Sequence, residues 1–157
     1  MKAASITDIR KELVTRKPAE IMDICLRLGR FKKENKELLT YLLFEASDEA
    51  GYLASVKAEI DEQMSQINFS HLYFVKKSLR KILRLISKHV RYMGAKEAEA
   101  DLLVYFLTAV KDADIKLKKN QALLNLYNLQ LKKLAAVVST LHEDIQFDYA
   151  LKLERLG

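Results

Sequence analysis

Residues 71–94, HLYFVKKSLRKILRLISKHVRYMG, decide the fold of this chain. The segment holds seven Lys and Arg residues and no Asp or Glu. Mostly apolar side chains recur in it at steps of three and four residues, which is the period of a helix with one buried face. We therefore predict a long helix whose inner stripe packs in the core and consists of Leu72, Val75, Leu79, Ile82, Ile86, His89 and Met93, widened by Leu83 and Val90.

Basic residues recur at the same steps on roughly the opposite side of this helix. We call the following six residues the basic ridge: Lys77, Arg80, Lys81, Arg84, Lys88 and Arg91. Phe74, Leu85 and Tyr92 fall near the ridge and outside the core stripe. The pattern predicts a cationic surface, with interspersed apolar contacts, that suits phosphates or acidic side chains.

The charge of the chain is concentrated in this one helix. The protein has 27 Lys and Arg against 21 Asp and Glu, a net charge of +6. Because seven of the basic residues lie in residues 71–94, the remaining 20 nearly balance the 21 acidic ones. The sequence therefore describes a near-neutral protein with one basic helix.

The composition favours a fold made only of helices. The 157 residues include four Gly and one Pro, and half of them are apolar, so long helices with short connections are expected. We predict an all-α fold of about eight antiparallel helices, arranged either as a helical bundle or as a short α-solenoid-like stack of helical hairpins. The length suits a single domain over residues 1–157.

Periodicity and capping residues set the expected helix limits. Ser5, Pro18 and Ser47 are expected at helix starts, and Gly94 at a helix end. In the first helices we expect Ile21, Ile24, Cys25, Leu28, Leu38, Leu39, Leu42 and Leu43 to point inward. The expected helices cover residues 6–16, 18–29, 34–46, 47–67, 68 or 70–93, 96–118, 120–141 and 143–155.

An internal resemblance links two parts of the chain. Each part reads as an apolar helix, an Arg followed by an aromatic residue, a charged turn, and then Leu-Leu-x-Tyr opening a second apolar helix. A pseudo-repeat covering 18–67 and 79–118 would favour stacked helical hairpins, as in α-solenoids. Chance similarity between amphipathic helix pairs is the other interpretation.

No catalytic or metal-binding pattern is present in the sequence. The three histidines lack ligand spacing, the single cysteine Cys25 lies on an apolar face, and no glycine-rich phosphate loop occurs. We expect His89 to be a hydrogen-bonded interior residue and His142 to mark a helix boundary. We therefore predict no catalytic residues, no metal site, no cofactor and no enzyme activity. A helical enzyme would need a deep polar pocket lined by convergent side chains.

The sequence carries no secretory or membrane-spanning signal. Its start, MKAASITDIRKEL, has no apolar core segment, and no stretch approaches the ~20 apolar residues of a span. We expect a cytoplasmic protein without a membrane partner. Residues 123–134 are rich in leucine and suit either the core or a dimer seam, so the oligomeric state stays open.

Two functions compete for the basic ridge. The first is a non-catalytic helical scaffold or protein-interaction domain that engages an acidic protein. The alternative is a nucleic-acid-binding domain that contacts phosphates through the same helix; a helix-turn-helix over residues 21–43 is disfavoured because Arg30 and Asn35 occupy positions that the motif keeps apolar. A third interpretation gives the ridge no partner, because the following acids on the flanking helices would neutralise it: Asp48, Glu49, Glu59, Asp61, Glu62, Glu97, Glu99 and Asp101.

Overall fold

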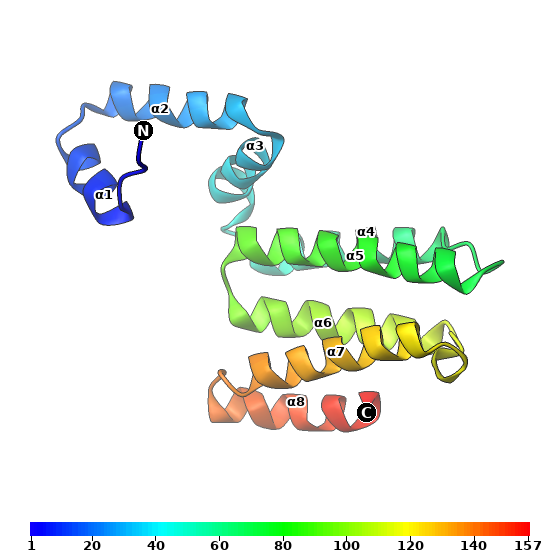
Figure 1. Cartoon of the computed structure of the whole chain (residues 1–157). Coiled ribbons are helices and arrows are strands. Elements are labelled where there is room, and N and C mark those ends of the chain that lie inside the picture. Colours follow the sequence, from blue (N-terminus) through cyan, green and yellow to red (C-terminus); the bar gives the residue numbers. More distant parts are fainter. The chain divides into compact units, whose positions relative to one another are not determined.

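The computed structural model describes all 157 residues, which form helices and turns without a strand (Figure 1). The all-α prediction is confirmed. The elements are α1 (Ile6–Val14), α2 (Pro18–Phe31), α3 (Lys33–Thr40), a π-helical turn η1 (Tyr41–Glu45), α4 (Glu49–Ser65), α5 (Leu72–Met93), α6 (Lys96–Asp112), a 3-10 turn η2 (Leu117–Lys119), α7 (Gln121–Val138) and α8 (Glu143–Leu156).

The chain forms two compact units. Unit 1 is Met1–Glu45 and unit 2 is Ala46–Gly157. We predicted a single domain over residues 1–157, and nothing in the composition marks this division, since residues 45–48, EASD, contain neither Gly nor Pro. The division also falls inside the first copy of the pseudo-repeat, residues 18–67, and the pseudo-repeat stays a prediction.

In unit 1, local capping follows the sequence. Ser5 Oγ accepts a hydrogen bond from the Asp8 backbone N–H at 3.2 Å, as expected for the start of α1. Pro18 opens α2, which continues to Phe31 instead of ending near Gly29. A Cβ at position 29 would lie 2.9 Å from Leu39 Cδ1, so a larger residue there would require the end of the Leu39 side chain to shift.

The expected inward face of unit 1 is only partly correct. Leu38, Leu39 and Cys25 are half-buried, but Ile24, Leu28, Leu42 and Leu43 are exposed, Leu43 by 69%. The apolar period of these helices is correct, but the helices of unit 1 are short and no second layer within the unit covers the stripe. Gly29 and Tyr41 are the buried residues of unit 1.

Unit 2 contains the hydrophobic core. Its helix α5 contacts α4, α6 and α7, and α8 packs on α6 and α7 (Figure 1). The predicted stripe of α5 is buried at Val75, Leu79, Ile82 and Ile86. It meets a core that includes Ile60, Leu103, Phe106, Leu123 and Leu134. Burial of each such side chain contributes roughly 1.5–3 kcal/mol, so the shared core of α4, α5, α6 and α7 stabilises unit 2.

Several helix ends differ from those expected. Asp48 caps α4 instead of Ser47, with its Oδ1 accepting from the Gly51 N–H at 3.0 Å. Helix α5 begins only at Leu72, because Asn68 Oδ1 accepts from the Ser70 N–H and closes a turn before it. Helix α6 ends at Asp112 instead of residue 118, since Asp114 has a left-handed φ of 49°. Gly94 ends α5 with φ 63°, as predicted.

No helix of the structure has the length and apolar content needed to cross a membrane.

Candidate interaction site on α5

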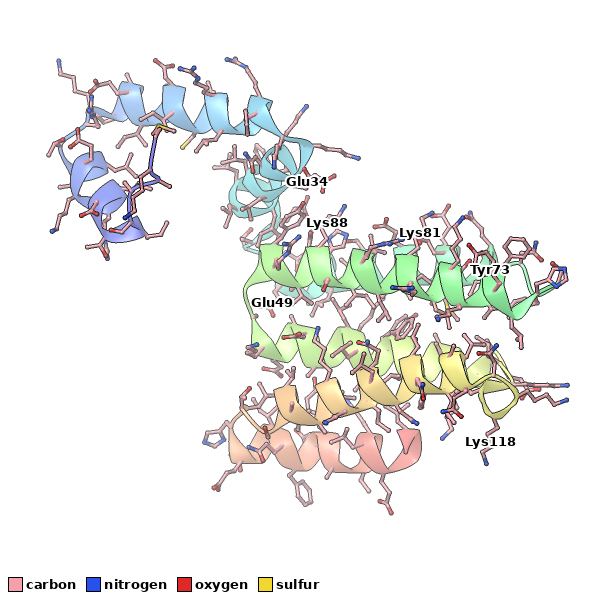
Figure 2. All side chains as sticks on the ribbon, in the orientation of Figure 1. Glu34, Glu49, Tyr73, Lys81, Lys88 and Lys118 are labelled. Atoms are coloured by element: carbon pink, nitrogen blue, oxygen red, sulfur yellow. The ribbon has the colours of Figure 1, made fainter.

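The basic ridge lies on the outer side of α5. Lys77, Arg80, Lys81, Arg84 and Arg91 are exposed, and Lys88 is half-buried. Figure 2 labels Lys81 and Lys88 on this helix. The helical period thus places the charged side chains opposite the buried stripe, as the sequence indicates.

The apolar residues beside the ridge behave differently from the prediction. Leu85 and Tyr92 are buried, and Leu85 belongs to the core of unit 2. The buried arc of α5 is wider than the stripe because this helix packs against α4 as well as α6 and α7. Phe74 is exposed at the start of the helix.

Asp61 of α4 and Asp101 of α6 bind partners other than the ridge. Asp61 accepts a hydrogen bond from the Tyr105 hydroxyl at 2.6 Å, and this bond raises the pKa of Tyr105 to about 12. Asp101 Oδ2 lies 2.6 Å from Lys57 Nζ. These two contacts join α4 to α6 and remove both carboxylates from reach of the ridge.

His89 occupies the inner side of α5 and takes part in a polar contact with α4. Its Nδ1 lies 2.7 Å from the Tyr52 hydroxyl, and its Nε2 lies 3.6 Å from a carboxylate oxygen of Glu59. The expected role of His89 as a hydrogen-bonded interior residue is confirmed. His142 caps α8 through its Nδ1, which accepts from the Asp144 N–H at 3.3 Å, so the expected helix boundary is confirmed too.

Glu99 is the buried acid of α6. Its carboxylate oxygens lie 3.1 Å from Lys133 Nζ of α7 and 3.4 Å from Lys96 Nζ. Because its side chain is only 10% exposed, these two ammonium groups supply the compensation that a buried carboxylate needs.

Five residues of the ridge consequently have no acidic partner in the structure. Lys77, Arg80, Lys81, Arg84 and Arg91 make no ion pair, while the neighbouring carboxylates of Glu59, Asp61, Glu99 and Asp101 are engaged elsewhere. Direct pairing with α4 and α6 therefore does not neutralise this part of the ridge.

A groove runs beside the ridge, between α5, α6 and α7. Its volume is about 510 Å³, and its floor is apolar, formed by Leu83, Ile86, Val90 and Leu103. Arg80 and Arg84 form one rim, and the other wall is α7 with Leu129, Gln130 and Lys133. Leu129 is 63% exposed and adds an accessible apolar side chain to this wall.

A second hollow of about 300 Å³ continues this groove toward the end of α5. It shares Ser87, Val90 and Glu99 with the first and adds Arg91, Gly94, Ala95 and Lys96. We call the two together the basic groove. Its lining holds five cations against one acid, Glu99, as follows: Arg80, Arg84, Arg91, Lys96 and Lys133.

The basic groove is equipped for recognition of anionic and apolar groups. Its one carboxylate is held by two lysines, and no His or Cys lines it. Elsewhere, the structure gathers no three His, Cys, Asp or Glu residues that could hold a metal ion.

Three residues of the groove were not identified from the sequence. Lys133 and Leu129 lie on α7, and helical period alone does not tell which side of α7 faces α5. The sequence places Glu99 only among the acids of the flanking helices that would neutralise the ridge. Its position between Ala98 and Ala100, both buried, is the only local signal that distinguishes it from Glu97.

The chain matches no family model, no curated protein and no solved structure at a significant level.

Proposed function

We propose that this protein is a non-catalytic interaction module whose basic groove binds an acidic, amphipathic helix of another protein. The observation that carries the proposal is the combination of an apolar floor with rim cations that have no acidic partner. Apolar side chains of the bound helix would cover the floor, and its carboxylates would meet the rim.

The spacing of the rim residues suits a helix. Arg80, Arg84 and Arg91 are separated by four and seven residues on α5. These steps correspond to about 6 Å and about 10.5 Å along a helix axis. A partner helix with Asp or Glu at the same steps would present its carboxylates at matching intervals, next to apolar residues at positions i, i+3 and i+4.

A protein partner is favoured over a nucleic acid by the lining of the groove. No aromatic side chain lines it, so it offers no surface on which bases could stack. Phosphate groups would make no favourable contact with the apolar floor or with the exposed Leu129. The nucleic-acid alternative uses the ridge alone. The proposal keeps the expected cytoplasmic location, where the thiol of Cys25 would stay reduced.

The test uses a helical peptide with leucines on one face and glutamates flanking them. Fluorescence anisotropy would measure its binding to the full chain, beside a peptide whose leucines are replaced by serine and a peptide whose glutamates are replaced by lysine. We expect binding of the first peptide only. The alternative function is tested by titrating mixed-sequence single-stranded DNA and RNA into the protein at several salt concentrations.

Two variants locate the binding. Leu129→Ser removes an exposed apolar contact of the groove, and Lys132→Glu reverses a charge on α7 at a residue that does not line it. We expect the first to weaken binding of the acidic peptide about tenfold and the second to change it little. Equal binding of all three peptides, or tighter binding of the nucleic acids than of the acidic peptide, would contradict the proposal.

A further inference from the structure

The connection between α4 and α5 exposes a cluster of large apolar side chains at one end of unit 2. Phe69, Leu72, Tyr73 and Phe74 are between 37% and 70% exposed, within six consecutive positions. The rings of Tyr73 and Phe74 lie 5.7 Å apart, centroid to centroid, and the ring of His71 lies 5.9 Å from that of Phe74. Exposed apolar residues gathered in this way mark a contact surface.

Lysines follow this cluster in the sequence and lie on a second connection at the same end of unit 2 (Figure 1). Lys76 and Lys77 follow the rings by about one helical turn, and residues 63–96 contain no Asp or Glu. Figure 1 shows the connection between α6 and α7 at the same end of unit 2, and Figure 2 labels Tyr73 and Lys118 there. That connection adds Lys116, Lys118 and Lys119, and also Asp112 and Asp114. We call this surface, from both connections, the aromatic end. Its five lysines outnumber the two acids of the α6–α7 connection together with Glu62 in the last turn of α4.

We propose that the aromatic end docks the protein on the surface of an anionic lipid bilayer. Aromatic rings and leucine partition into the boundary between headgroups and acyl chains, and lysines one turn behind them would lie at the level of the lipid phosphates. Each lysine near an anionic surface adds about fivefold to the binding constant. The proposed contact is peripheral and involves only the aromatic end.

The geometry of the rings favours lipid over single-stranded nucleic acid. The planes of Tyr73 and Phe74 meet at 67°, so the two rings do not form a parallel platform for successive bases. Leu72 has no ring for a base to stack on, whereas it would be stabilised among acyl chains. The expectation of no membrane partner rested on the absence of a spanning segment and did not consider a surface contact.

Cosedimentation of the full chain with vesicles tests the proposal. Vesicles of phosphatidylcholine alone would be compared with vesicles of phosphatidylcholine and phosphatidylserine in equal parts, at low salt. We expect binding to the second kind only. Tyr73→Ser should lower that binding about tenfold, since an exposed ring is lost from the contact. Phe147→Ser, which removes a ring of α8 that is 78% exposed, is the matched control and should leave binding unchanged.

A tryptophan reporter gives a second readout, which shows whether position 73 itself enters an apolar environment on binding. The chain contains no Trp, so Tyr73→Trp introduces a single emitting residue. Its emission should shift to the blue when phosphatidylserine vesicles are added, and that of Phe147→Trp should not. Lys118→Ala should weaken vesicle binding about fivefold.

Three results would overturn the proposal. The first is no vesicle binding at low salt. The second is vesicle binding that Tyr73→Ser and Phe147→Ser affect equally. The third is a tryptophan at position 73 whose emission responds to single-stranded DNA or RNA but not to vesicles, which would assign the aromatic end to nucleic acid.

Discussion

Glu99 controls the charge of the basic groove. It is the one acidic side chain in the lining, and Lys96 and Lys133 hold it from two sides. The carboxylate cancels part of the positive charge that five cations create, and it connects α6 to α7 at the wall of the groove. Its substitution should therefore change recognition more than a surface acid would.

Glu99→Gln is expected to strengthen binding of the acidic peptide. The amide keeps one acceptor oxygen, which can serve only one of the two lysines, and it removes one negative charge, so the affinity should rise about threefold to tenfold at low salt. Glu97→Gln, on the exposed side of the same helix, is the control. Peptide anisotropy measures both, and an affinity that falls with Glu99→Gln would show that the carboxylate orients the lysines instead of opposing the ligand.

The Tyr105 hydroxyl should lose its proton at a higher pH than an ordinary tyrosine, chiefly because of one hydrogen bond. Its bond to Asp61 raises the pKa of its hydroxyl to about 12, and burial raises the pKa of Tyr149 to about 12 as well. In a titration of the folded protein that follows tyrosinate absorbance, both residues should be among the last tyrosines to ionise as the pH rises. Asp61→Asn should return the pKa of Tyr105 toward its ordinary value of about 10 and leave the pKa of Tyr149 raised.

The same shift fixes the sign of the pH dependence of stability. A hydroxyl whose pKa is higher in the folded state than in the unfolded chain stabilises the fold fully below the unfolded pKa of about 10. That contribution disappears as the pH rises through the folded value of about 12. Urea unfolding should therefore show a free energy of unfolding that falls between these values, and less steeply in Asp61→Asn.

At the scale of the element, α5 has one side that packs in the core and one side that is exposed and charged. Its inner side fills the core of unit 2, and its outer side carries the ridge. Substitutions on the two sides should therefore separate stability from binding.

Leu79→Ala should lower the free energy of unfolding by about 3 kcal/mol, because it removes a fully buried side chain and leaves a cavity. Lys81→Ala, two residues on and exposed, should change that free energy by less than about 0.5 kcal/mol. Urea denaturation measures both. Comparable losses at the two positions would show that α5 is not oriented as described.

Gly94 ends α5 by its backbone conformation alone. Its φ is 63°, and a Cβ at this position would meet no atom within 4 Å. Gly94→Ala should then cost about 1 kcal/mol from left-handed backbone strain without any steric clash. A loss several times larger would contradict this explanation.

The helical period and the capping residues were sufficient to predict the elements themselves. They placed the buried part of the core stripe of α5, its stop at Gly94 and the cap at Ser5, but they wrongly included Leu72, which is 37% exposed at the first position of the helix. They could not place Leu85, because the width of a buried arc depends on how many helices surround it. For the same reason the pairing of Glu99 with Lys133 was missed: it depends on the packing of α7 against α6, which local sequence does not encode.

At the scale of the whole molecule, the two units differ in how much they bury. Unit 2 has a continuous core, whereas Ile24, Leu28, Leu42 and Leu43 of unit 1 remain exposed. The sequence shows the same amphipathic period in both, so it could not distinguish a helix with a covered face from one without.

Residues 46–157 should therefore fold alone. We expect this fragment to show a helical circular dichroism spectrum and cooperative urea unfolding, because its core residues come from its own helices. Residues 1–45 alone should be far less helical, since short helices without a core are marginal in water. A fragment 46–157 that unfolds without cooperativity would contradict the division into units.

The central claim is that the rim cations of the basic groove recognise carboxylates, and a charge exchange tests it most directly. The affinity of the acidic helical peptide would be measured for the unaltered chain and for Arg84→Glu, and then with the lysine-substituted peptide. We predict that Arg84→Glu weakens binding of the acidic peptide by about tenfold or more and improves binding of the lysine peptide. Unchanged affinity of the acidic peptide for Arg84→Glu would contradict the account.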